Sequence, residues 1–227
     1  MNISIFDIIG PVMIGPSSSH TAGAARLAFV AAKIAEKPFN KVHFGLHGSF
    51  AKTGRGHGTY EALLAGALGL SEDDERLKIS HEIARERGIE ASFEELELFD
   101  CHENTARITF YHSDKSESVI EGSSIGGGRI RITNINGMPT DFRAECPTIL
   151  ITQRDAPGVV SEISGVLAKN NINIAVMRVS RTAKGHLAST VIETDSKIPL
   201  GIKSALCAAA NILSVRIVDV REGEQNV

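Results

Sequence analysis

Two short segments each place one histidine among small, hydroxyl-bearing or glycine residues. The first, Ile14 to Thr21, reads Ile-Gly-Pro-Ser-Ser-Ser-His-Thr, and the second, Gly54 to Thr59, reads Gly-Arg-Gly-His-Gly-Thr. A packed core makes little use of consecutive serines, because each buried hydroxyl needs a hydrogen-bond partner. Histidine titrates near neutral pH and can accept or donate a proton. The pattern therefore indicates proton transfer on a small polar molecule.

Each histidine segment precedes a run that is typical of a helix. Pro16 stops any preceding helix, and the serines that follow can cap a helix predicted from about 20 to 35. The glycines of the second segment let the backbone approach a ligand, and a second helix is predicted at 57–70. The free N–H groups at a helix N-terminus favour a carboxylate or phosphate. Taken alone, the second segment could also be a tight turn with an incidental histidine.

At these residues the chain resembles a known family. Ile14–Gly23, Gly48–Thr59 and Ser124–Gly128, followed by the C-terminal third, are similar to the β chain of bacterial iron–sulfur L-serine dehydratases. The resemblance implies conversion of L-serine to pyruvate and ammonia at a [4Fe–4S] cluster, without pyridoxal phosphate. It places the ligands of the cluster in a separate α subunit and allows a monovalent cation as a further cofactor. One departure is Tyr60, where family members commonly carry Asp.

Dehydration of serine requires removal of the α-proton and loss of the β-hydroxyl. A cluster can act as a Lewis acid on the hydroxyl but is a poor base, so a histidine is the natural proton acceptor. We assign His57 as the candidate base and His20 as an orienting or second proton-transfer group. The substrate carboxylate is expected to contact Ser17, Ser18, Ser19 and Thr21, and further substrate contacts are expected from Gly56, Gly58 and Thr59.

The other histidines are weaker candidates. His43 and His47 alternate along a predicted strand and are expected to form a buried, hydrogen-bonded pair. A metal site at this pair stays open, although no further ligand falls at metal-site spacing. The rest are expected at the surface: His81, His102, His112 and His186.

Cysteine usage and charge restrict the class of protein. Cys101, Cys146 and Cys207 are too scattered for a cluster motif and are expected to be free thiols of a cytosolic protein. The formal net charge is -3 and there is no basic run, which argues against nucleic acid as a partner. Met1–Gly10 lacks the basic start of a signal peptide, and no apolar stretch reaches the roughly twenty residues of a membrane span. A cytoplasmic protein without a membrane segment is expected.

A length of 227 residues favours two domains. The proline- and glycine-containing segment 136–147 shows no periodicity and is the predicted boundary, which gives domains at 1–140 and 147–221. Helices and strands of the first domain do not alternate strictly, so an α+β layered sheet is predicted rather than a doubly wound one. The resemblance assigns it to the allosteric-substrate-binding type, which some phosphoglycerate dehydrogenases also carry. Its further elements are predicted at 72–87 (helix), 41–47, 91–99, 105–112, 116–122 and 128–134 (strands).

The second domain follows the order βαββαβ, which is typical of a ferredoxin-like fold. With Asp155-Ala-Pro-Gly-Val159 it resembles an ACT domain, a small amino-acid-sensing module. In such domains the ligand lies between two copies, which implies a homodimer. The resemblance points to Asp155, Gly158, Val159, Asn173 and Ile174 as regulatory contacts. Gly158 could instead permit close packing at the helix start, and whether the domain binds an amino acid or only dimerises stays open.

Two functions of different class follow. The favoured one is the β subunit of an iron–sulfur L-serine dehydratase, active only with its cluster-bearing α subunit. The alternative is a non-catalytic regulatory protein that binds an amino acid. A phosphate-recognising enzyme has weaker support, because no Walker-type Lys or Asp accompanies the glycine loops. A neighbouring reading frame that encodes clustered cysteines would favour the first function over the second.

Overall fold

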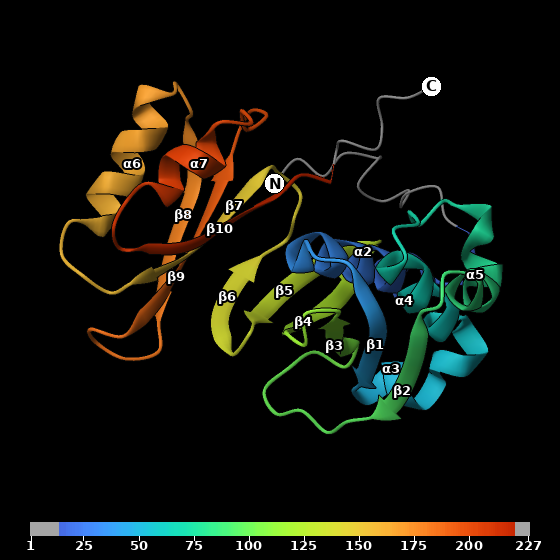
Figure 1. Cartoon of the computed structure of the whole chain (residues 1–227). Coiled ribbons are helices and arrows are strands. Elements are labelled where there is room, and N and C mark those ends of the chain that lie inside the picture. The colour runs from blue at the N-terminus through green and yellow to red at the C-terminus, as the bar shows by residue number, and fades with distance from the viewer. Residues whose placement is uncertain (1–13, 221–227) are drawn as a thin grey trace, which may run out of the picture. The chain divides into compact units, whose positions relative to one another are not determined.

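A mixed six-stranded sheet and an antiparallel four-stranded sheet organise the chain (Figure 1). The computed structural model describes residues 14–220, so Met1–Gly10 and the outermost ends of the two predicted domains lie outside the described residues. By its internal contacts the chain divides into two units between Asn136 and Gly137. Within residues 14–220 no helix is long and apolar enough to cross a bilayer.

The six-stranded sheet has the order β2-β1-β3-β4-β5-β6. Strand β1 pairs parallel with β2 and antiparallel with β3, and the pairs β3–β4 and β4–β5 are antiparallel. On β5, Ile130 and Ile132 are buried while Arg129 and Arg131 are exposed, so one face of the strand packs in the core and the other faces solvent. The strands are β1 (Phe39–Leu46), β2 (Glu90–Glu95), β3 (Thr105–His112), β4 (Glu117–Gly126), β5 (Arg129–Ile135) and β6 (Met138–Phe142).

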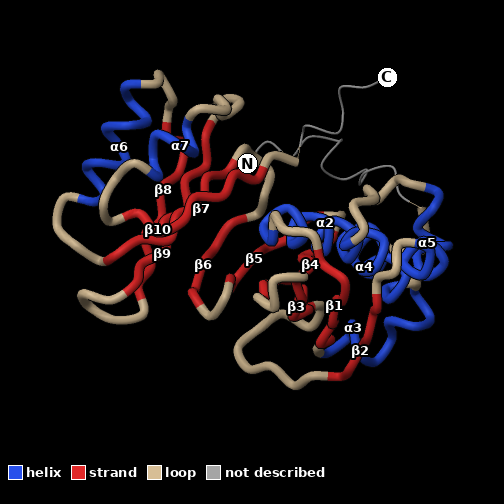
Figure 2. The backbone as a smooth tube through the Cα atoms, viewed as in Figure 1, coloured by secondary structure: helices blue, strands red, loops and turns tan. Residues whose placement is uncertain are grey.

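Helices pack on this sheet (Figure 2). Helix α2 lies across β4 and β5 and against α4, and its buried face is made of alanines with Leu27, Val30 and Ile34. The alanines allow α2 to lie close to its neighbours. The helical elements are the π-helical turn η1 (Ser18–Ala22), α2 (Gly23–Ala35), α3 (Gly48–Thr53), the 3₁₀ turn η2 (Gly54–His57), α4 (Thr59–Ala67), η3 (Glu75–Ile79) and α5 (Ser80–Glu86).

Two glycines set the closest approaches of α2. A Cβ atom added at Gly66 of α4 would lie 2.0 Å from the carbonyl oxygen of Ala25, and one added at Gly23 would lie 2.0 Å from Ser124 Oγ on β4. Real side chains do not tolerate such distances, so hydrogen is the only substituent these positions admit without moving the helix. These two contacts therefore determine how closely α2 lies to α4 and to β4.

Several predicted boundaries were wrong in detail. The helix predicted to start at residue 20 begins as a π-helical turn at Ser18 and becomes α-helical at Gly23. The stretch Gly48–Thr53 is helix α3, which the prediction missed because its flanking glycines indicated a turn. Segment 136–147, the predicted domain boundary, contains strand β6, and the two units divide at its first residues. Short elements bounded by glycine carry too little periodicity to be recognised.

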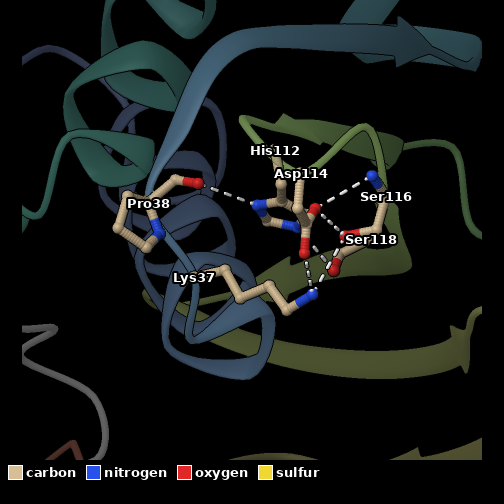
Figure 3. A network of polar contacts seen from close by, with 6 residues as sticks. All are labelled: Lys37, Pro38, His112, Asp114, Ser116 and Ser118. Atoms are coloured by element: carbon tan, nitrogen blue, oxygen red, sulfur yellow. Dashed lines mark hydrogen bonds and ion pairs between the residues drawn. The ribbon is translucent and has the colours of Figure 1, made fainter.

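His112 was expected at the surface, and this prediction was wrong. Its side chain is buried at 5% exposure, with Nδ1 3.0 Å from the Pro38 carbonyl oxygen and Nε2 2.8 Å from Ser118 Oγ (Figure 3). Beside it, Lys37 Nζ lies 2.7 Å from Asp114 Oδ2. This hydrogen bond from Lys37 holds the pKa of the Asp114 carboxyl well below its usual range. The network joins the α2–β1 connection to the β3–β4 turn.

His43 and His47 do not form the predicted buried pair. Both are half-buried, and each has its own partners. His43 Nδ1 lies 2.9 Å from Ser92 Oγ and its Nε2 lies 2.9 Å from a Glu94 oxygen, both on β2. His47 Nδ1 accepts a hydrogen bond from the Leu98 N–H at 3.2 Å. Both histidines therefore fasten β1 to β2 and the segment after it.

The C-terminal unit contains the predicted ferredoxin-like arrangement. Its sheet has the order β10-β7-β9-β8 with antiparallel pairs, as expected when two βαβ crossovers interleave. Helix α6 buries Val159, Ile163 and Leu167 in the core beneath the sheet. The elements are β7 (Thr148–Arg154), α6 (Val159–Lys169), β8 (Ile174–Arg181), β9 (Leu187–Thr194), α7 (Ile202–Cys207) and β10 (Ile212–Val218).

Candidate functional site

The two histidine segments come together in the N-terminal unit. The ring centroids of His20, in η1, and His57, at the end of η2, lie 5.2 Å apart with an interplanar angle of 51°. A hydrogen bond from Thr21 Oγ1 to the His57 carbonyl oxygen, 3.0 Å long, ties the two segments directly. His57 is exposed and His20 is half-buried. The His57 imidazole is therefore accessible to a ligand, whereas the His20 imidazole is partly covered by its neighbours.

Helix α3 supplies the partners of His20 that the sequence analysis missed. His20 Nε2 lies 3.1 Å from both Ser49 Oγ and Thr53 Oγ1, and the edge of its ring faces Phe50 with centroids 5.4 Å apart. Residues four apart share one face of a helix, so Ser49 and Thr53 could have been paired once a helix was assigned there. Two hydroxyls and one aromatic ring thus fix the orientation of this imidazole.

The serine run forms a tight cap before α2. Ser17 Oγ accepts a hydrogen bond from the His20 N–H at 3.1 Å, and Ser19 Oγ lies 3.3 Å from His20 Nδ1. The Ser18 carbonyl oxygen accepts from the Gly128 N–H at 3.2 Å. Gly126, Gly127 and Gly128 all have positive φ, which only glycine adopts freely. The glycine turn between β4 and β5 therefore supports the serine run.

The structure places most of the predicted substrate contacts near the two rings. The three serines of the run are half-buried, Gly56 is exposed, and Gly58 is the N-cap residue of α4 with φ 69°. Thr59 differs, because its side chain is fully buried and its hydroxyl has no partner among the described residues. Tyr60, the departure from the family pattern, packs on Phe93 with ring centroids 4.6 Å apart.

Burial shifts the ionisation of His20. The loss of solvent lowers its pKa, the Ser49 contact raises it, and the neighbouring His57 lowers it again, with a net shift below the ordinary value of 6.5. Since the neutral form of a buried histidine is favoured when its pKa falls, His20 is neutral near pH 7. Its neutral form is retained as the pH decreases below 6.5 until the lowered pKa is reached.

This difference can be measured by NMR. We expect the His20 ring signals to titrate below the ordinary histidine pKa of 6.5, because His20 is partly buried and faces His57. Replacing His57 with alanine removes the neighbouring charge and is expected to raise the pKa of His20. A His81→Ala variant is the control and leaves His20 unchanged. A His20 pKa above 6.5 would contradict the proposed effect of burial and of His57.

The described residues offer no ligand set for an iron–sulfur cluster. Within residues 14–220 no three His, Cys, Asp or Glu side chains gather closely enough to hold a metal ion. Cys101 and Cys207 are exposed and Cys146 is half-buried, all as free thiols. A cluster needs three or four thiolates in one place, which this part of the chain does not provide.

In the C-terminal unit, Asp155 braces the β8–β9 turn. Its Oδ2 accepts hydrogen bonds from the Gly185 N–H at 2.9 Å and from Arg181 at 3.0 Å. The Gly185 N–H and then the Arg181 guanidinium hold the pKa of the Asp155 carboxyl below its usual range. This carboxylate is therefore already engaged within its own unit.

The other predicted regulatory residues lie where α6 and β8 begin: Gly158 and Val159 at the start of α6, Asn173 and Ile174 at the start of β8. Gly158 has φ 89° and no described atom lies within 4 Å of a Cβ built there, so the close-packing interpretation was wrong and the glycine is required by backbone conformation. Val159 is buried in the core, Ile174 is half-buried, and Asn173 donates from Nδ2 to Asp195 at 2.6 Å. A pocket lined by Gly158, Glu162, Lys169 and Asn211 runs along α6.

The fold and the site together define a two-domain α+β protein, with a histidine-bearing sheet domain and a C-terminal ACT domain. A family model described as serine dehydratase beta chain matches residues 4–86, and an ACT domain model matches residues 148–211. The chain is 39% identical over 218 residues to the L-serine dehydratase, beta chain, of Peptoniphilus asaccharolyticus, covering 96% of this chain and 98% of that protein. The chain belongs to the L-serine dehydratase β-chain family.

Further relatives agree with this assignment. The chain is 42% identical over 212 residues to a probable L-serine dehydratase, beta chain, of Bacillus subtilis, covering 93% of this chain and 96% of that protein. It is also 27% identical over 198 residues to the D-3-phosphoglycerate dehydrogenase of the same organism, covering 87% of this chain but 37% of that protein.

Proposed function

We propose that this chain is the β subunit of an iron–sulfur L-serine dehydratase, which converts L-serine to pyruvate and ammonia in the cytoplasm. The observation that carries the proposal is the pairing of His20 and His57, 5.2 Å apart, inside the segment that matches the serine dehydratase β-chain model. Proton removal next to a carboxylate needs a base, and an exposed histidine beside a fixed one supplies it.

In this proposal the two histidines have different roles. Exposed His57 accepts the α-proton of the substrate. His20 remains neutral, because its pKa is lowered, and so does not place a second positive charge against the imidazolium that forms on His57. The contacts of His20 with Ser49 and Thr53 keep its ring at a fixed orientation. The hydroxyls of the serine run, which lie beside His20, contact the bound substrate.

The cluster is assigned to a separate α subunit. Three scattered cysteines and the lack of a ligand group among residues 14–220 support this division of labour. A cluster in the partner would polarise the departing β-hydroxyl, while this chain binds the substrate and holds its proton. The active site then lies where the two subunits meet, and a monovalent cation there is part of the same proposal.

Reconstitution tests this function. The purified chain alone is expected to be colourless and to form no pyruvate from L-serine. Anaerobic co-expression with a cysteine-rich partner chain is expected to give a complex that forms pyruvate. Rapid turnover by the isolated chain would contradict the division between subunits. Serine binding by the complex without any turnover would favour the regulatory alternative.

The ACT domain is proposed to pair two copies of the chain. Strand β8 is an edge of its sheet and exposes apolar side chains, with Val179 48% exposed. Exposed edges of this kind are commonly covered by a second copy. An amino acid bound at this interface would contact Gly158, Asn173 and Ile174, with Asp155 already engaged by its own turn.

Sedimentation equilibrium checks the pairing. The purified chain is expected at a mass near twice 24.3 kDa at micromolar concentration. Val179→Glu is expected to shift this mass toward that of the monomer, because it places a charge on the proposed interface. The control is Leu200→Glu, at a side chain 98% exposed in a loop, which leaves the mass unchanged. A wild-type chain that sediments only as a monomer would contradict the pairing.

A further inference from the structure

A pocket of about 260 Å³ lies beside His57, and its lining carries both signs of charge. Thr21, His57 and Gly58 form one side of it. Glu61 of α4 contributes a carboxylate, and Arg55 of η2 and Lys78 of η3 contribute cationic groups. All of these residues belong to the N-terminal unit. The lining of the pocket thus combines a candidate proton-transfer residue with side chains of both charge signs.

Glu61 carries one carboxylate oxygen that no described residue satisfies. Its Oε2 atom is buried and has no hydrogen-bond partner among residues 14–220. A glutamate at the third position of a helix usually bonds back to the N–H of the N-cap residue. Here the N–H of that residue, Gly58, donates to the Gly54 carbonyl oxygen instead. Burial of a charged oxygen without a partner is costly, so this atom is suited to a cationic group of a ligand.

The cationic side chains of the pocket are likewise available. Neither Arg55 nor Lys78 forms an ion pair with Glu61 or with another described residue, although all three line one cavity. The guanidinium of Arg55 lies over the ring of Tyr60, 5.7 Å from its centroid, which positions it without neutralising it. A guanidinium can bind a carboxylate through two parallel hydrogen bonds.

We propose that this pocket binds the backbone of an α-amino acid, with the ammonium at Glu61 and the carboxylate at Arg55 and Lys78. A zwitterion satisfies both signs of charge at once, whereas a phosphate or dicarboxylate would meet the Glu61 carboxylate and a diamine would meet the two cations. The inference rests on the proposed function, which identifies the amino acid as L-serine and requires its α-carbon to face His57.

Ligand binding to the full chain tests the charge assignment. The chain has two tyrosines and no tryptophan, and both tyrosines, Tyr60 and Tyr111, precede the C-terminal unit. Tyrosine fluorescence therefore reports on the N-terminal unit, and calorimetry on the same samples gives the dissociation constant independently. The probes are L-serine, ethanolamine, which lacks the carboxylate, and 3-hydroxypropionate, which lacks the ammonium. L-Serine is expected to bind at least tenfold more tightly than either analogue.

Two variants separate the two charges. Glu61→Gln keeps the size of the side chain and is expected to weaken L-serine at least tenfold while leaving 3-hydroxypropionate unchanged. Arg55→Gln is expected to weaken L-serine and 3-hydroxypropionate but not ethanolamine. The control is Glu86→Gln, at an exposed position of α5, which changes none of these constants. Circular dichroism of each variant verifies that the fold is retained.

The outcomes distinguish this inference from the proposed function. The inference is overturned if wild-type chain binds no L-serine in the N-terminal unit, or if both variants bind it as the wild type does. In the reconstituted enzyme, Glu61→Gln is expected to raise KM for L-serine at least tenfold. Unchanged KM with full turnover would refute the inference and leave the proposed function standing. Serine binding that depends on Glu61, without turnover by the complex, would support the inference and contradict the proposed function.

Discussion

Replacing His57 with alanine is expected to lower the kcat of the reconstituted enzyme by about a hundredfold or more, the usual scale for a general base. His57 is the exposed member of the histidine pair, and its carbonyl oxygen is anchored by Thr21, so the ring is presented from a fixed backbone. Steady-state rates of pyruvate formation measure the effect. His20→Ala is expected to cause a loss of similar size, because the ring behind His57 is removed together with its contacts to α3.

Chemical rescue separates a missing base from a disturbed fold. Imidazole added to the His57→Ala enzyme is expected to restore part of the rate, since the deleted ring was open to solvent. His81→Ala and His186→Ala are the controls, because both side chains are exposed and lie outside the site; their rates stay near that of the wild type. Near-full activity of His57→Ala would show that another group removes the proton.

Replacing Gly66 with alanine is expected to destabilise the N-terminal unit by about 3 kcal/mol or more, the upper part of the range for overpacked cores. The added methyl group would lie 2.0 Å from the Ala25 carbonyl oxygen and 2.9 Å from the Phe29 backbone nitrogen, so α2 and α4 must move apart. Urea denaturation followed by circular dichroism measures the loss of free energy of unfolding.

The matched control for this variant is Gly56→Ala. At Gly56 no described atom lies within 4 Å of an added Cβ, and its φ is not positive, so stability is expected to change by less than about 0.5 kcal/mol. If Gly66→Ala unfolded at the same urea concentration as the wild type, the close contact between α2 and α4 would be wrong.

The parts of the fold that follow from periodicity were predictable from sequence. The ferredoxin-like order of the C-terminal unit agrees with the prediction because α6 carries apolar residues at helical spacing, of which Val159, Ile163 and Leu167 are buried. The two histidines were also recognisable, since hydroxyls and glycines around a histidine are poorly suited to a core. The burial of His112 could not be predicted from the sequence, because its partners Pro38 and Ser118 approach it only once the strands have paired.

The candidate site, like the burial of His112, could be predicted only in part from the sequence. Ser49 and Thr53 contact His20 only because Gly48–Thr53 forms a helix that the glycines around it conceal in the sequence. Glu61 lies one turn into α4, and its unpartnered oxygen is evident only once the N–H of Gly58 is seen to donate elsewhere. The spacing of residues in the sequence identifies those that can do chemistry, whereas tertiary packing determines which of them come into contact.

The most direct test of the account is the rate of pyruvate formation from L-serine by three anaerobic preparations that share one batch of the cluster-bearing partner. These are the partner alone, the partner with this chain, and the partner with a chain in which His20 and His57 are both alanine. The account predicts turnover only in the second preparation. Equal turnover by the partner alone would contradict it, because this chain would then contribute neither substrate binding nor proton transfer.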